Sequence, residues 1–300
     1  MRLEGLIAAV VTPMNPDGSL CLERVADVVS FLQSRNVKGA FVCGTTGESA
    51  SLAADERRAV AEAYIDAASG SMPVIVHVGH DSLTEAAGLA RHAAEAGADA
   101  IAAVPPVYFK PENIDVLADC CARIAEAAEA LPFYYYHFPK LTGVAFPMRN
   151  FLPAAGAKIP NLGGVKFTHM DTMDYQRCLE ADGGRYQALF GHDGYVLAAL
   201  GVGAKGFVGS AHNFASPLYH KLRNAFTQGD KSGSLKWQSI AAGMVGTFTQ
   251  FGTVPSVKAT MSLLGIECGP CRLPLRSLDE TRSAALKRAL QGHGVWDVIA

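Results

Sequence analysis

The stretch Gly163-Gly164-Val165-Lys166-Phe167-Thr168 has the composition of a short buried strand that ends in a lysine and a threonine. An ammonium group is costly to bury unless it is paired or loses its proton. A lysine held away from water binds its proton less tightly, and such an amine is suited to attack a carbonyl carbon. The alternative is a lysine at a strand end that reaches solvent or pairs with a carboxylate.

Similar short apolar runs recur along the chain and alternate with alanine- and leucine-rich periodic segments. The expected strands are Gly5–Val11, Ala40–Cys43, Val74–Val78, Ala100–Val104, Phe133–His137, Gly164–Phe167, Ala188–Gly191 and Gly206–Gly209. The expected helices between them are Leu22–Arg35, Asp55–Ser69, Leu83–Ala96, Pro111–Ala130, Pro147–Ala155, Asp171–Ala181, Asp193–Leu200 and Pro217–Thr227. Gly39, Gly97 and Gly203 follow helices, where a left-handed residue is favoured.

The eight strand–helix units predict an α/β fold of the (β/α)8 TIM barrel type. A doubly wound sheet is the alternative, but the sequence has no glycine fingerprint for a dinucleotide. After Gly229 the pattern changes to three helical stretches at Ser232–Thr247, Pro255–Leu264 and Leu278–Leu290. We therefore expect a catalytic barrel over residues 1–228 and a C-terminal helical extension over residues 229–300, packed on the barrel without a flexible linker.

The composition excludes several classes of protein. The chain has 300 residues, of which 49% are hydrophobic and 18% charged, so it can bury a large core. A formal net charge of -2 gives no electrostatic footprint for nucleic acid or an anionic membrane. Apolar runs such as Leu6–Val11 are too short to span a bilayer, and the N-terminus lacks the features of a signal peptide. We expect a cytoplasmic protein.

Seven cysteines, an odd number, are scattered along the chain, as is typical of a reducing compartment. Cys268-Gly-Pro-Cys271 copies the thioredoxin redox motif, but Pro274 follows closely and argues against the helix that this chemistry needs. There is no second CxxC motif to complete a zinc site. We therefore expect neither a metal nor a redox role.

Catalytic groups of such barrels lie at the carboxyl ends of the strands. After the second expected strand comes Gly44-Thr45-Thr46-Gly47-Glu48-Ser49, in which glycines, hydroxyls and exposed N–H groups suit a carboxylate. The alternative is an ordinary turn followed by a helix cap. The motif lacks the lysine of a phosphate-binding loop, which argues against a nucleotide.

The fifth expected strand and its end read Phe133-Tyr134-Tyr135-Tyr136-His137-Phe138-Pro139. Side chains alternate along a strand, so Tyr134 and Tyr136 point to one face and Tyr135 to the other. A phenol that faces the mouth of a barrel can transfer a proton, although filling of the core is the alternative. We expect His137 to be a packing residue, because no other ligand lies at metal-binding spacing.

Three more strand ends carry polar or aromatic groups. Val104–Pro111 forms a stiff aromatic loop with Tyr108, which suggests a lid or a subunit contact. Gly191-His192-Asp193-Gly194 and Ser210-Ala211-His212-Asn213 end the seventh and eighth strands and could grip a hydroxyl-rich substrate. Asp193 could equally be a helix N-cap.

Together these motifs resemble the class I pyruvate aldolase family that contains dihydrodipicolinate synthase and N-acetylneuraminate lyase. The resemblance covers essentially the whole chain and rests on Gly44–Glu48, Tyr136–Pro139, Gly164–Thr168 and Gly203–Gly206 leading to Ser210. Phe133–Gly143 and Phe251–Leu275 are similar to the sialic-acid-cleaving branch. Leu141 stands where the synthases carry an arginine for a second carboxylate, which argues against an amino-acid-biosynthetic role.

The resemblance implies a mechanism for a small-molecule substrate without metal or organic cofactor. Lys166 would form a Schiff base with the ketone of a 2-keto acid, Thr45 and Thr46 would hold its carboxylate, and Tyr136 would move the proton of its hydroxyl. The remaining substrate contacts would come from Thr168, Gly191, Asp193, Gly194 and Ser210. Tyr108 matches a tyrosine that reaches a neighbouring subunit in the synthases, which implies a homo-oligomer, a tetramer by analogy.

One departure keeps the substrate open. The lyases follow the aspartate after strand seven with a glutamate that grips the tail of the sugar, whereas Asp193 is followed here by Gly194. The implied reaction is reversible cleavage of N-acetylneuraminate to N-acetylmannosamine and pyruvate. The alternatives are an aldolase or dehydratase of the same superfamily that acts on a different 2-keto-3-deoxy sugar acid, and a keto-acid sensor without turnover.

Overall fold

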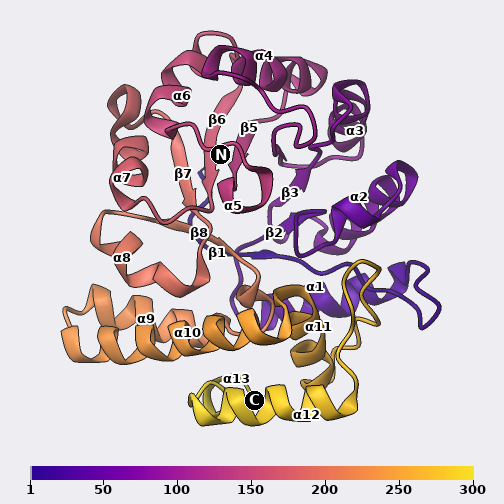
Figure 1. Cartoon of the computed structure of the whole chain (residues 1–300), viewed down its shortest axis with the longest axis vertical. Helices are drawn as coiled ribbons and strands as arrows, with labels where there is room; N and C mark the ends of the chain where they lie inside the picture. Colours follow the sequence, from indigo (N-terminus) through magenta and orange to yellow (C-terminus); the bar gives the residue numbers. More distant parts are fainter. Residues whose placement is uncertain (1) are drawn as a thin grey trace.

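Eight parallel strands close into a barrel in the order of the sequence (Figure 1). The structure is a computed structural model that describes residues 2–300. The strands are β1 (Gly5–Ala9), β2 (Gly39–Val42), β3 (Val74–His77), β4 (Ala100–Ala103), β5 (Phe133–His137), β6 (Leu162–Phe167), β7 (Gln187–Phe190) and β8 (Gly206–Gly209). The predicted TIM barrel is confirmed, and the predicted strand ends lie within two residues of the observed ones.

The two faces of each strand divide the core into an inner and an outer part. Ile7, Phe41, Tyr134 and Tyr136 belong to a cluster inside the barrel. Tyr135 belongs to the larger cluster between the strands and the helices. The predicted alternation of the three tyrosines is confirmed, and it aims the phenol of Tyr136 into the barrel.

Helices cover the outside of the barrel (Figure 1). The helical segments up to residue 227 are η1 (Leu22–Arg24), α1 (Val25–Ser34), η2 (Ser49–Ser51), α2 (Ala54–Ala68), α3 (Leu83–Glu95), α4 (Ile114–Ala125), η3 (Glu126–Ala128), α5 (Pro139–Thr142), α6 (Met148–Gly156), α7 (Thr172–Glu180), η4 (Ala181–Gly184), η5 (Asp193–Tyr195), α8 (Val196–Gly201), η6 (Ala211–Asn213) and α9 (Ser216–Thr227). The helix expected from Pro111 begins at Ile114, because the side chain of Asn113 accepts a hydrogen bond from the backbone N–H of Val116 and caps it there.

Two of the three glycines expected to end helices have the left-handed conformation. Gly97 has a φ of 89° and Gly203 a φ of 99°. The prediction for Gly39 is wrong, since this residue lies in β2. Asn36, with a φ of 56°, takes the left-handed position after α1, because asparagine tolerates it better than most residues with a Cβ.

The chain ends in four further helices, α10 (Lys231–Phe251), α11 (Thr253–Leu263), α12 (Glu280–Gly292) and α13 (Trp296–Ile299). α10 packs along α9 and contacts η5, α11 and α12, while α12 and α13 lie farther from the barrel (Figure 1). The division of the chain at residue 228 stays a prediction. Among residues 2–300, no helix is both long enough and apolar enough to cross a membrane.

Candidate active site

Lys166 projects into the barrel from β6, next to Tyr136 on β5, with which it is in register. The strand β6 can lie close to β7 because Gly164, with a φ of 152°, has no Cβ that would overlap the carbonyl group of Gln187. The side chain of Lys166 is buried, and its Nζ lies 3.8 Å from the ring centroids of both Phe41 and Tyr136. The amine is thus held between two aromatic rings.

Burial lowers the pKa of Lys166 to about 7, and the negative charge of Asp193 opposes this fall only in part. The described residues place no carboxylate within ion-pair distance of Nζ. A large fraction of Lys166 is therefore uncharged near neutral pH, which is the form that attacks a carbonyl carbon.

The phenol of Tyr136 lies beside this amine and is also buried. Its hydroxyl is 3.4 Å from Oγ1 of Thr45, and its ring meets the ring of His77 edge to face with centroids 5.8 Å apart. Burial raises the pKa of Tyr136 to about 12, so the resting phenol is protonated at neutral pH. In this form the hydroxyl of Tyr136 can donate a proton.

Two more pairs of predicted residues meet at the mouth of the barrel. Oγ1 of Thr46, after β2, lies 2.7 Å from Oγ of Ser210, after β8. Thr168 follows β6, and a Cβ at Gly191 after β7 would overlap its hydroxyl. Oγ1 of Thr168 is buried without a hydrogen-bond partner in the part of the chain that the structure describes. A buried hydroxyl of this kind is a ready donor or acceptor for a bound molecule.

Asp193 is anchored to the neighbouring strand end. Its Oδ2 accepts a hydrogen bond of 3.0 Å from the backbone N–H of Ala211, and its carbonyl group accepts one of 3.0 Å from the hydroxyl of Tyr219. The alternative reading of Asp193 as a helix N-cap is wrong, because His192 holds that position and its ring Nδ1 accepts from the N–H of Gly194.

The last two predicted residues are Tyr108 and Gly194. The side chain of Tyr108 is 81% exposed and packs edge to face against Phe109, with ring centroids 5.0 Å apart. Gly194 is buried in η5, where an added Cβ would lie 3.5 Å from Val245 and 3.6 Å from the ring of His192. In this chain Tyr108 therefore projects into solvent, and position 194 borders α10.

Sequence reasoning missed Phe41 and His77, which surround Lys166 and Tyr136. His77 is buried, and its Nδ1 and Nε2 contact the carbonyl group of Cys43 at 2.8 Å and the N–H of Val104 at 3.3 Å. Nε2 must accept from that N–H, so the ring is neutral with its proton on Nδ1. Burial holds the pKa of His77 well below its usual value. Strand alternation places both residues inward, so it is the signal that could have found them.

The expected packing role of His137 agrees with its place outside the barrel, where its ring lies 5.1 Å from that of Phe167. Burial lowers the pKa of His137 to about 3. Burial also raises the pKa of Cys268 to about 12 and that of Cys271 to about 11, which disfavours the reactive thiolate. Within residues 2–300, no three metal-ligating side chains come together.

Comparison with known proteins shows the relatives of this chain. Residues 2–293 match the model of the dihydrodipicolinate synthetase family. N-acetylneuraminate lyase of Gallus gallus is 40% identical over 300 residues, which cover 98% of this chain and 97% of the relative. The human N-acetylneuraminate lyase is 41% identical over 293 residues, covering 95% and 92% of the two chains.

A solved structure agrees with these relatives. The N-acetylneuraminate lyase of Proteus mirabilis superposes with a TM-score of 0.96 at 37% identity, over 98% of this chain and all of the other. The family model spans nearly the whole chain. The chain belongs to the dihydrodipicolinate synthetase family.

Proposed function

We propose that this protein is a class I aldolase that cleaves N-acetylneuraminate reversibly to N-acetylmannosamine and pyruvate. The observation that carries the proposal is the environment of Lys166, a buried amine with a pKa lowered to about 7 beside the phenol of Tyr136. The relatives with this activity in their names, at about 40% identity over nearly the whole chain, support the choice of substrate.

In the proposed mechanism the neutral amine of Lys166 adds to the ketone carbon of the open-chain substrate and forms a carbinolamine. Tyr136 donates its proton to the departing hydroxyl, which leaves as water, and the products are an iminium ion and a phenolate. The positive charge of the iminium ion stabilises the phenolate that lies next to it.

The carbon–carbon bond then breaks, and its electron pair moves into the iminium ion to give an enamine. The phenolate of Tyr136 takes the proton of the substrate hydroxyl, which becomes the carbonyl oxygen of the aldehyde. The phenol next protonates the enamine carbon, and hydrolysis of the resulting imine releases pyruvate and restores the amine of Lys166. Each proton that Tyr136 gives is thus recovered, and the proposed reaction needs neither a metal nor an organic cofactor.

The groups at the strand ends would hold the substrate in this orientation. Thr45 and Thr46 would bind the carboxylate, and the hydroxyl of Thr168, which lies close to Gly191, would also contact the substrate. Asp193 and Ser210 would contact the hydroxyl groups of the sugar. We further propose a cytoplasmic homo-oligomer, a tetramer by analogy, in which Tyr108 meets a neighbouring subunit.

The test is reductive trapping. Borohydride added with pyruvate should fix a covalent adduct on the wild-type protein, because it reduces the imine to a stable amine, and intact-mass measurement will detect it. Lys166→Ala should give no adduct. An adduct on this variant would contradict the assignment of Lys166.

A second candidate function is an aldolase or dehydratase of the same superfamily with a shorter 2-keto-3-deoxy acid as its substrate. The observation that favours it is Gly194, which supplies no carboxylate for the tail of a sialic acid. Pyruvate release from N-acetylneuraminate, measured beside a panel of shorter acids, separates the two functions. A faster reaction of a shorter acid would support the Schiff-base mechanism but would replace N-acetylneuraminate as the proposed substrate. Trapping of pyruvate without release from any acid would instead indicate a keto-acid sensor.

A further inference from the structure

The loop that carries Thr45 and Thr46 has an unusual backbone. Cys43 before it and Glu48 at its end have φ values of 54° and 56°, although neither is glycine. Left-handed conformations are disfavoured for residues with a Cβ and persist only where the surrounding structure holds them. The shape of this loop must therefore be imposed by contacts from outside it.

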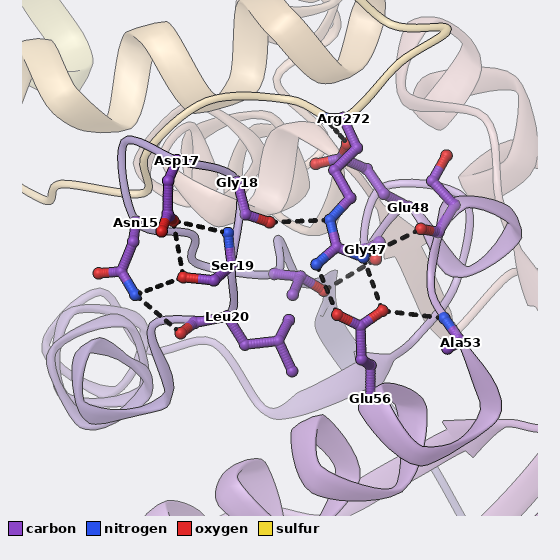
Figure 2. A network of polar contacts seen from close by, with 12 residues as sticks. Asn15, Asp17, Gly18, Ser19, Leu20, Gly47, Glu48, Ala53, Glu56 and Arg272 are labelled. Carbon is purple, nitrogen blue, oxygen red and sulfur yellow. Dashed lines mark hydrogen bonds and ion pairs between the residues drawn. The ribbon is translucent and has the colours of Figure 1, made fainter.

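One of these contacts is a buried ion pair. Oε1 of Glu48 lies 2.6 Å from Nζ of Lys258 in α11, and the two side chains are 0% and 4% exposed. Oε2 of Glu48 accepts a hydrogen bond of 2.8 Å from the backbone N–H of Arg272 (Figure 2). Nζ of Lys258 also donates to the carbonyl group of Pro270, at 2.7 Å. The loop is thus bonded to two places in the C-terminal part of the chain.

The segment around Arg272 is itself firmly held. The guanidinium group of Arg272 pairs with both carboxylate oxygens of Glu56 at 2.6 Å, and its Nε donates to the carbonyl group of Gly18 at 2.9 Å (Figure 2). Its Nη1 donates to the carbonyl group of Ser51. Figure 2 shows Arg272 between the turn of residues 15–20 and the start of α2. The anchor for Glu48 is therefore fixed on several sides.

Loss of the ammonium group of Lys258 would leave the carboxylate of Glu48 buried without a counter-charge. A buried charge without a partner is strongly unfavourable, and movement of the side chain to water would relieve it. That movement would release the left-handed backbone of Glu48. The N–H of Glu48 donates to the carbonyl group of Thr45 at 3.1 Å, so the change would pass directly to Thr45, whose hydroxyl lies 3.4 Å from that of Tyr136.

We propose that Lys258 is a positioning residue, which holds the Thr45–Thr46 loop in its substrate-binding shape through Glu48 and thereby sets the affinity for the carboxylate of a 2-oxo acid. The proposal rests on the proposed function for the identity of that ligand. Neither Lys258 nor Arg272 takes part in the proposed chemistry.

Kinetics with Lys258→Met form the first arm of the test. This variant keeps most of the stem and removes the charge. We expect kcat/KM to fall by about tenfold to a hundredfold, as for a small misplacement of substrate-positioning groups. Most of this fall should come from a rise in KM. The pyruvate concentration that half-saturates borohydride trapping should rise in parallel. Lys258→Arg, which restores the charge, should recover part of the affinity. Lys236→Met, the same change at an exposed lysine of α10, should resemble the wild type.

Hydrogen–deuterium exchange without any ligand forms the second arm. Backbone amides of residues 44–51 should exchange faster in Lys258→Met than in the wild type, whereas those of β5 and β6 should not change. If Lys258→Met fails to fold, the double variant Glu48→Gln/Lys258→Met serves instead, because it removes both buried charges together with the pairing. We expect it to raise KM in the same direction but by less.

The outcomes separate this proposal from the proposed function. Unchanged KM with unchanged exchange overturns the proposal, and so does faster exchange with unchanged KM, since the pair would then be structural only. A fall in kcat that accounts for the whole loss of kcat/KM, without a rise in KM, also contradicts the proposal. A wild-type protein that never traps pyruvate refutes the proposed function, and the control of the loop by Lys258 is then decided by exchange alone.

Discussion

The amine of Lys166 should titrate near neutrality. Burial lowers its pKa to about 7, below the ordinary value of 10.5, so the ammonium form gives way to the reactive amine as the pH rises through about 7. We expect the initial rate of pyruvate-dependent borohydride trapping to increase across this range and then level off. A midpoint close to 10, as for a lysine in water, would contradict the buried environment.

A variant of Asp193 provides the matched control for this titration. The negative charge of Asp193 favours the ammonium form of Lys166 and raises its pKa. Asp193→Asn removes that charge, so the midpoint of trapping should move to lower pH. Pyruvate is the right probe here, because it lacks the hydroxylated tail that Asp193 is proposed to bind.

Position 194 should govern the choice of substrate. Gly194→Glu would restore the carboxylate that the lyases have after their aspartate, and an added Cβ there meets Val245 and His192 only at ordinary contact distances. A carboxylate acceptor for a sugar hydroxyl is worth ~1.5–3 kcal/mol. We expect the ratio of kcat/KM for N-acetylneuraminate to that for a shorter 2-keto acid to rise. Gly194→Gln is the uncharged control, and an unchanged ratio would mean that residue 194 does not face the sugar.

The strand β6 depends on a glycine that no other residue can replace. Gly164 combines a φ of 152° with a position at which a Cβ would overlap the backbone of β7. We expect Gly164→Ala to cost about 3 kcal/mol or more of unfolding free energy, because overpacking and backbone strain add together. Urea denaturation followed by circular dichroism measures this cost.

Gly246 is the control for that substitution. It lies inside α10, and an added Cβ would have no neighbour within 4 Å. Gly246→Ala should stabilise the protein by up to about 1 kcal/mol, because alanine favours a helix over glycine. Equal effects of the two substitutions would argue against the close approach of β6 and β7.

At the level of the elements, the sequence predicted most of the barrel and the residues at the centre of the candidate site. Runs of apolar residues gave the eight strands, and the strand-end rule brought out Lys166, Tyr136 and the two threonines. The ion pair of Glu48 with Lys258 could not be predicted in this way. Its partners are far apart in the chain, and only the path of the C-terminal segment brings them together.

Local patterns also failed where a tertiary contact decided the conformation. Gly39 was expected to end a helix but pairs in β2, because Asn36 takes the left-handed position after α1 instead. Phe41 and His77 looked like ordinary strand residues. Their role beside Lys166 and Tyr136 depends on the register across several strands, which periodicity alone does not define.

At the scale of the whole molecule, two neighbouring aromatic side chains project far into solvent. Tyr108 and Phe109 are 81% and 84% exposed, which is unusual for side chains of this size in a monomer. We expect light scattering to give the mass of an oligomer, and the double variant Tyr108→Ser/Phe109→Ser to weaken the assembly. Leu235→Ser, at another exposed apolar residue, is the control. A monomeric wild type would refute the proposed oligomer.

The pairing of Glu48 with Lys258 has a consequence for the way the protein is made. A ribosome adds Glu48 early and reaches Lys258 and Arg272 only when most of the chain has emerged. Until then the loop beside the reactive amine lacks its counter-charge and its anchor. A polypeptide that ends before α11 would keep every strand of the barrel but would lack the contacts that hold its substrate loop. Cellular quality control would then recognise it as incompletely folded.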